Sequence, residues 1–175
     1  KEMEFSSASP TQIASVVTGM VKYEVFYLNI VSALELSIEY CWNNRNETLR
    51  YWEIGVALFV GSQEGDLEGG QDGGELLYST LKKLCAYFDT CDNAEWIMDA
   101  FQKGSLHISS QECNLAEQLL RDFIVPSLQE TLIQGCLASA VEVSDSSSES
   151  SSVGSAHAFA GSILPLVNKA RESSA

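Results

Sequence analysis

Basic residues are scarce in this chain of 175 residues. Lysine and arginine together number 10, against 24 aspartate and glutamate residues, so the net charge is −14 and the pI is about 4.3. Nucleic acids and anionic membrane surfaces are bound mainly through lysine and arginine, so the composition argues against both classes of partner. The acidity is compatible with cationic partners or metal ions, although it more often serves only to keep a protein soluble.

Long apolar runs are also missing. The longest, from Val56 to Val60, is far shorter than the roughly 20 residues that a transmembrane helix needs. The hydrophobic fraction of 45% is ordinary for a folded protein, and the length fits one domain or one compact domain with a tail. The chain begins at Lys1, with neither an initiator methionine nor a signal peptide. We therefore interpret it as a processed mature chain or as an excised piece of a longer one.

Motifs of catalysis are absent from the sequence. The only histidines are His107 and His157, and neither lies in a recognisable nucleophile arrangement. The Glu-x-x-His pairs of helical di-iron sites do not occur, and the glycines between positions 69 and 74 are not followed by the lysine of a phosphate-binding loop. We expect a protein that is not an enzyme.

Apolar residues recur at helical spacing, and strand-like alternation is nowhere sustained, so the sequence predicts an all-α fold. Ser9-Pro10-Thr11 predicts a helix start, and one long helix or two abutting helices should then run to Cys41. The first apolar stripe of this segment consists of Ile13, Val16, Val17, Met20 and Val21. Further helices are expected at about 48–60, 76–88 and 93–103, from 109 onward, and at 156–170.

Glycine, proline and serine predict where these helices start, stop or bend. Gly61-Ser62 should end the second helix and Gly104 the fourth, while Ser109-Ser110-Gln111-Glu112 matches a capping box that starts the fifth. Pro126 should kink the fifth helix, and Pro165 should interrupt the last one. The apolar face of the fifth helix is predicted to consist of Leu115, Leu119, Phe123, Leu128 and Leu132.

These elements predict an antiparallel helical bundle of about five to six helices. Its core should span residues 1–143 and include a glycine-rich acidic loop at 61–74. A flexible serine-rich linker is expected at 144–155, followed by a terminal helix within 156–175 that packs back on the bundle.

The cysteines and one sequon indicate an oxidising compartment. No Cys-x-x-Cys pair is present among the five cysteines, but a helix end followed by a turn could bring Cys85 and Cys91 within disulfide range. Asn46-Glu47-Thr48 is a glycosylation sequon in a polar connection. Together these features favour an extracytoplasmic location, whether secreted, periplasmic or at the cell surface, or the lumen of an organelle.

Several carboxylates are candidates for binding a cation. The acidic loop contains Glu64, Asp66, Glu68, Asp72 and Glu75, whose hard oxygens suit calcium or ferric iron, although the spacing does not match an EF-hand. The alternative is a solvated acidic loop without a ligand. Glu53 lies in an apolar helix beside Trp52, so its carboxylate must be paired, bound to a ligand or turned to solvent. Tyr78 directly follows the loop, and a tyrosine phenolate is a further ligand for ferric iron.

A set of segments occurs in an order that resembles a known family. The segments are 27–41, Tyr51-Trp52-Glu53 to Gly65, 74–78, 83–91, Val125-Pro126 to Leu132, and 157–167. This set resembles the algal iron-assimilation and phytotransferrin family, whose members are cell-surface or periplasmic proteins associated with iron uptake. The resemblance covers about residues 20 to 170, and its most specific parts are Trp52-Glu53 to Gly65 and Cys85 to Cys91.

The resemblance implies a binding site that this chain retains only in part. The surviving site residues would be Glu35, Glu53, Glu64, Tyr78 and Lys83, and the ligand would be ferric iron with carbonate. The family pattern has potential ligands at positions where this chain has Ser32, Ala33, Leu36, Ile54 and Phe59. Phenylalanine, isoleucine, leucine and alanine cannot coordinate a metal, so these replacements preserve packing volume while removing ligands.

The family also has cysteines at the positions of Cys41, Cys85, Cys91 and Cys113. Cys85–Cys91 is the preferred disulfide, Cys41 can pair with Cys113, and Cys136 is then the odd thiol.

These observations lead to two hypotheses about function. The first is a non-catalytic interaction module derived from the iron-assimilation fold, without a bound cofactor. It would be a subunit or linker of a larger assembly, for example a photosynthetic one facing a plastid lumen. Its partners would be proteins that bury an apolar surface including Trp42, Trp96 or the helix at 156–170. The alternative is a protein that binds ferric iron with carbonate for iron uptake.

Overall fold

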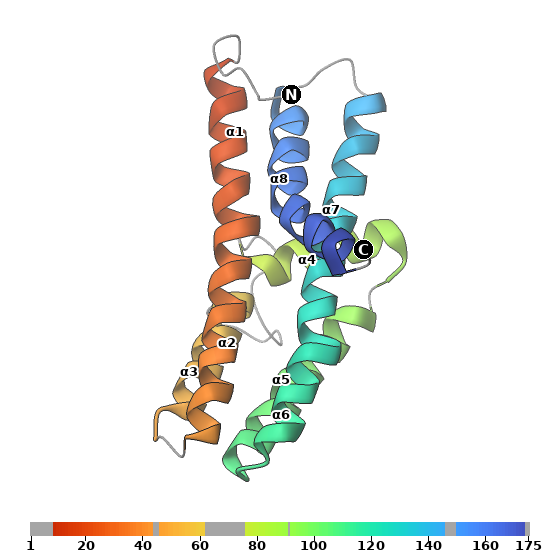
Figure 1. Ribbon diagram of the computed structural model, residues 1–175. Helices are drawn as coiled ribbons and strands as arrows, with labels where there is room; N and C mark the ends of the chain where they lie inside the picture. The colour runs from red at the N-terminus through yellow and green to blue at the C-terminus, as the bar shows by residue number, and fades with distance from the viewer. Residues whose placement is uncertain (1–8, 44–45, 62–75, 91, 146–149, 174–175) are drawn as a thin grey trace. The chain divides into compact units, whose positions relative to one another are not determined.

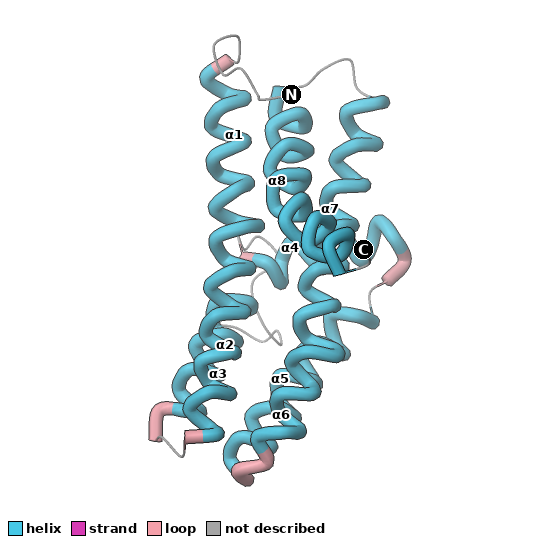
Figure 2. Tube along the Cα trace, viewed as in Figure 1, coloured by secondary structure: helices cyan, strands magenta, loops and turns pink. Residues whose placement is uncertain are grey.

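The computed structural model of the chain describes residues 9–43, 46–61, 76–90, 92–145 and 150–173. All elements in these ranges are helical and no strand occurs among them (Figures 1 and 2), which confirms the predicted all-α fold. The helices are α1 (Pro10–Met20), α2 (Phe26–Trp42), α3 (Thr48–Val60), α4 (Leu77–Phe88), α5 (Asp92–Ser109), α6 (Cys113–Leu119), α7 (Val125–Asp145) and α8 (Ser150–Ser173). A π-helical turn at Val21–Val25 joins α1 to α2, and another at Leu120–Ile124 joins α6 to α7.

The chain divides into two compact units. The central unit consists of residues 26–131, and the terminal unit combines the two chain ends, 1–25 and 132–175. The terminal unit therefore contains α1, the C-terminal part of α7 and α8, while α2 to α6 belong to the central unit. Among the residues with a described position, no helix is long and apolar enough to cross a membrane.

Several predicted helix boundaries are confirmed. Ser9 caps α1 by accepting a hydrogen bond from the backbone N–H of Gln12, whose side chain accepts one from Ser9 in return, and Pro10 occupies the first helical position. Helix α3 spans the predicted residues and ends at Gly61, whose φ of 84° is a conformation that glycine adopts without a steric penalty. The segment that follows, 62–75, contains most of the predicted acidic loop and lies outside the described residues.

The core of the central unit is organised around Trp52. This side chain is fully buried, and its indole Nε1–H donates a hydrogen bond of 3.0 Å to the backbone carbonyl of Phe101. The rings of Trp52 and Phe59 both pack against Phe101, with ring centroids 6.4 Å and 5.3 Å from it. On the other side of α3, Gly55 allows close contact with Leu34 of α2. Helix α3 is thus held between α2 and α5.

Gly104 does not end a helix, contrary to the sequence-based expectation. Helix α5 continues through it to Ser109. A Cβ atom built on Gly104 would lie only 2.0 Å from Cζ2 of Trp52, so the indole occupies the space that any larger side chain would need. The glycine is required by packing, and the burial of Ile108 one turn later stabilises the continuation of the helix.

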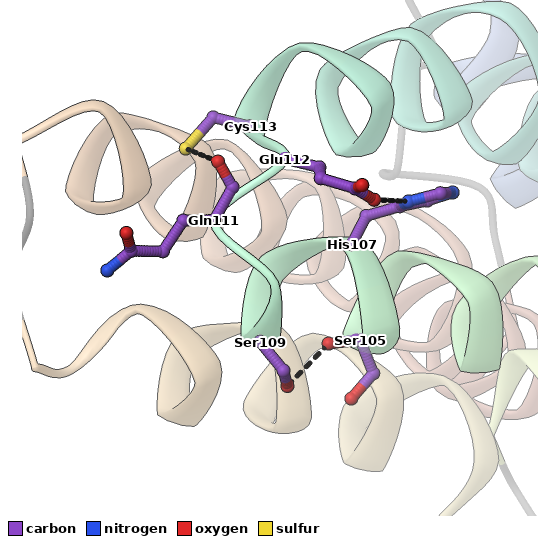
Figure 3. A network of polar contacts seen from close by, with 6 residues as sticks. All are labelled: Ser105, His107, Ser109, Gln111, Glu112 and Cys113. Atoms are coloured by element: carbon purple, nitrogen blue, oxygen red, sulfur yellow. Dashed lines mark hydrogen bonds and ion pairs between the residues drawn. The ribbon is translucent and has the colours of Figure 1, made fainter.

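The predicted capping box at residues 109–112 is also wrong. Ser109 belongs to the last turn of α5, where its hydroxyl donates to the carbonyl of Ser105 (Figure 3). Gln111 adopts a left-handed conformation with φ of 60°, and the backbone N–H groups of Gln111 and Glu112 bond back to Ile108 and His107. This is a Schellman-type C-terminus, with glutamine where glycine is usual. Glu112 then precedes α6, and its side chain lies 2.7 Å from Nδ1 of His107 (Figure 3).

The π-helical turn at Leu120–Ile124 changes the predicted buried face of the fifth helix. Leu128 and Leu132 are fully buried as predicted, but Leu115 is 45% exposed. The buried positions before and within the turn are instead Cys113, Ala116, Leu120 and Ile124. Pro126 lacks an N–H and so cannot complete the α-helical pattern with residue 122. We attribute the wider turn just before it to this missing donor.

Small residues hold the helices of the terminal unit close together. A Cβ on Gly19 of α1 would meet Ala158 of α8, and one on Gly154 would meet Ser15. The ring of Phe159 stacks on Tyr23 at a centroid distance of 3.7 Å and lies over Gly135 of α7. Helix α8 therefore contacts both α1 and α7.

Helix α8 is longer than the sequence predicted. Residues 150–155, which were expected in the serine-rich linker, form its first turns, and the contact of Gly154 with α1 explains why they are helical. Helix α7 likewise extends to Asp145, and residues 146–149 lie outside the described ranges. Pro165 does not interrupt α8, which remains helical to Ser173.

Cys41 of α2 and Cys113 of α6 form a disulfide, the second of the two pairings that the sequence analysis considered. Cys85 is also disulfide-bonded, but its expected partner Cys91 lies outside the described residues. Cys136 is a free thiol on α7. The Cys41–Cys113 bond connects positions 72 residues apart in the sequence, so it removes much of the conformational freedom of the unfolded central unit.

We expect Gly104→Ala to destabilise the protein by about 2 kcal/mol or more, because the added methyl group would displace Trp52 from its hydrogen-bonded position. Urea unfolding followed by circular dichroism measures the change. Gly161→Ala is the matched control, because a Cβ there has its nearest neighbour, Met20 Cε, at 3.9 Å. That change should be neutral or stabilising by up to about 1 kcal/mol. Equal effects of the two substitutions would contradict the packing role of Gly104.

Replacing both Cys41 and Cys113 with alanine should lower the free energy of unfolding by about 2 to 4 kcal/mol, because the unfolded chain regains the entropy of a loop of this length. Denaturant unfolding under non-reducing conditions measures the loss. Cys136→Ala removes a cysteine that makes no disulfide and should change stability much less. Identical midpoints for the double variant and the native chain would show that the bond does not stabilise the fold.

Candidate functional site

The expected metal-binding residues lie on three helices of the central unit. Glu35 on α2, Glu53 on α3 and Lys83 on α4 are all exposed, and Glu64 lies outside the described residues. No group of three or more histidine, cysteine, aspartate or glutamate side chains that could hold a metal ion occurs in the part of the chain that the structure describes. Of the expected set, Glu53 lines a cleft between α3 and α5.

Tyr78 differs from the other members of the set because it is buried. Only 5% of the residue is exposed, and its ring makes an edge contact with Phe59 at a centroid distance of 5.7 Å. The ammonium group of Lys82 lies 5.7 Å from the centre of the same ring, which is a cation–π arrangement. These contacts make Tyr78 part of the packing between α3 and α4.

Two other tyrosines are held in the neutral form by their surroundings. Burial raises the pKa of Tyr27, and the negative charge of Glu35 raises it further, while the hydrogen bond from Gln129 to the phenol oxygen (2.9 Å) acts in the opposite direction. In the terminal unit, burial raises the pKa of Tyr23, and Glu142 adds to this effect. A raised pKa disfavours the phenolate that a ferric ion would bind.

A cleft of about 610 Å³ lies between α3 and α5. Its apolar lining comes from Trp52, Val56, Ala57, Val60, Met98, Phe101 and Leu106. The remaining lining residues are Glu53, Gly61, Gln102 and Ser105. Its volume is within the range of pockets that bind small molecules. The sequence singled out Trp52 and Glu53, but it gave no indication that α5 would supply the opposite wall.

Large apolar side chains are exposed on two helices of the terminal unit. The α1 face consists of Ile13, Val17 and Met20 together with Val21, the first residue of the π-helical turn after α1, and the α7 face consists of Ile133, Leu137 and Val141. In each set the spacing of three or four residues places the side chains on one side of the helix. The α1 residues belong to the apolar stripe predicted from the sequence, and of the members of that stripe only Val16 is buried.

Charged residues are missing from the helical stretches that carry these faces. Residues 10–21 and 131–141 contain no lysine, arginine, aspartate or glutamate, although charged residues make up 19% of the chain. Exposed helical surfaces normally carry charges, and apolar faces without them mark sites of association. This absence of charge is the sequence signal that could have revealed both faces.

Other residues with sequence-based predictions are exposed. Trp42 and Trp96 are 57% and 55% exposed, and the indole N–H of Trp42 lies 3.3 Å from a carboxylate oxygen of Glu117. Asn46, in the predicted glycosylation sequon, is exposed in the connection between α2 and α3, where an attached glycan remains a prediction.

The stability of the protein should fall as the pH rises above about 10. Unfolded Tyr27 would ionise near the ordinary pKa of 10.0, whereas the folded phenol keeps its proton to higher pH, so unfolding in this range releases a proton. Urea unfolding between pH 9 and 11 should show a shallower decline for Tyr27→Phe than for the native chain. A difference titration at 295 nm that shows Tyr27 ionising at or below pH 10 would contradict the expectation.

The chain matches no protein-family model, no curated protein and no solved structure. The resemblance to the iron-assimilation family is therefore still a prediction, and the functional conclusions below depend on the chain's own residues.

Proposed function

We propose that this chain is a non-catalytic helical interaction module that acts as a subunit or linker of a larger protein assembly. The observation that carries the proposal is the pair of uncharged, exposed apolar faces on α1 and α7 of the terminal unit. An isolated soluble domain gains nothing from exposing such faces, because burying them releases free energy in proportion to their area.

Protein is the partner class that fits these faces best. Valine, leucine, isoleucine and methionine at helical spacing are suited to packing against the apolar side of another helix. The scarcity of lysine and arginine argues against nucleic acid and anionic lipid. Exposed Trp42 and Trp96 in the central unit are further candidate contacts, since tryptophan is enriched among residues that dominate binding energy.

An oxidising compartment is part of the proposal. The Cys41–Cys113 disulfide supports it, because such bonds persist in secreted, periplasmic and luminal proteins and are rare in reducing compartments. We favour the interaction module over ferric-iron binding because the expected ligands in the described chain are exposed on separate helices or, for Tyr78, buried in a packing contact.

The proposal is tested by charging each face in turn. Val17→Glu and Leu137→Glu alter side chains that are both 55% exposed, so each variant should fold with little change in unfolding free energy. Tagged full-length chains would be used to capture proteins from an extract of the source organism, with quantification by mass spectrometry. At least one protein retained by the native chain should be reduced about tenfold or more with a face variant, because binding would bury an unpaired carboxylate.

Ile54→Glu is the matched control. Ile54 is an exposed apolar residue on α3, in the central unit, so the same substitution there should leave the captured set unchanged. If all three variants retain the same proteins as the native chain, the two faces are not binding surfaces and the proposal fails.

A further inference from the structure

The cleft between α3 and α5 has a fixed inner wall. Trp52 cannot rotate away without breaking its hydrogen bond to the carbonyl of Phe101, and Gly104 accommodates the ring from behind. Phe101, which also lines the cleft, is only 2% exposed and is held by contacts with Trp52 and Phe59. Because this wall is already ordered, the protein loses less conformational entropy when it binds a small molecule.

The cleft has an acidic end and an apolar end. Trp52 contacts Gly104, so their sequence neighbours Glu53 and Ser105, both of which line the cleft, lie at the same end of it. The contact of Phe59 with Phe101 places Val60 and Met98 toward the other end. Polar groups are thus concentrated near Glu53, while the rest of the lining is mainly aliphatic and aromatic.

The charge of the lining selects one class of ligand. Among the described residues that line the cleft, Glu53 is the only ionisable one, and no lysine, arginine or histidine of the described chain accompanies it there. A carboxylate or phosphate ligand would meet the negative charge of Glu53 without any compensating cation. An ammonium group would instead gain an ion pair with Glu53 and a hydrogen bond to the hydroxyl of Ser105.

We propose that this cleft binds a small hydrophobic amine, with its ammonium group beside Glu53 and Ser105 and its apolar body along Val56, Val60 and Met98. The site is independent of the apolar faces on α1 and α7, so the two proposals can fail separately. No covalent step is involved.

The probes are three molecules with one shared apolar body: 4-phenylbutylamine, 4-phenylbutanol and 4-phenylbutyrate. Trp42→Phe combined with Trp96→Phe leaves Trp52 as the only tryptophan, so its fluorescence reports on the wall of the cleft alone. In this background the amine should quench or shift the emission saturably and bind more tightly than the alcohol. The carboxylate should bind most weakly of the three.

Two substitutions separate the contributions of charge and shape. Glu53→Gln should weaken binding of the amine about three- to five-fold, as expected for an exposed ion pair, and leave the alcohol unchanged. Glu95→Gln, an exposed glutamate on α5 outside the cleft lining, should affect neither probe. Ala57→Trp fills the cleft from an exposed position and should abolish binding of all the probes, as should Gln102→Trp from the opposite wall. Because each of these variants adds a second tryptophan, their binding is measured by calorimetry and not by fluorescence.

Three outcomes would overturn the proposal. The first is the absence of saturation by the amine up to its solubility limit. The second is equal affinity for amine and carboxylate. The third is unchanged amine binding in both tryptophan-filled variants, whose folding is verified by circular dichroism. None of these results would affect the association test made with Val17→Glu and Leu137→Glu.

Discussion

The packing of Trp52 against Gly104 is the contact on which the central unit depends. It sets the separation of α3 and α5, because the indole fills a space that the glycine leaves empty. The hydrogen bond to the Phe101 carbonyl satisfies the one polar atom that the ring carries into the core. The rings of Phe59 and Phe101 then complete an aromatic layer that reaches Tyr78 on α4. Trp52 and Phe101 of this layer also line the cleft beside Glu53.

Much of the fold could be predicted from sequence periodicity. Helical spacing located every helix, and the capping residues around Ser9 and Gly61 placed two boundaries correctly. The errors came from residues that serve packing between helices but belong to types that usually mark a local feature, such as the end of a helix. Gly104 was predicted to end a helix because glycine often does so. Here the glycine instead leaves space for the ring of Trp52, which lies 52 positions earlier in the chain. Leu115 was predicted to share one face with Leu128 and Leu132, because Pro126 signals a distortion of the helix but not that it takes the form of a π-helical turn, which shifts the buried face.

The candidate sites could be predicted from the sequence only in part. Glu53 was identified as unusual because it interrupts an apolar stretch, and it does line a cleft. Its neighbours in that cleft come from α5, about 50 residues away, and nothing local in the sequence connects the two helices. For the α1 face, periodicity predicted a shared side of the helix but could not show what covers that side.

The Cys41–Cys113 bond also determines how the chain responds to cleavage. Every peptide bond between these two positions lies within a covalently closed ring, and the acidic segment 62–75 is part of it. A protease that cuts the chain once inside this ring opens it without releasing a fragment. The two pieces separate only when the disulfide is reduced, so in an oxidising environment the nicked molecule keeps its mass and the proximity of its helices.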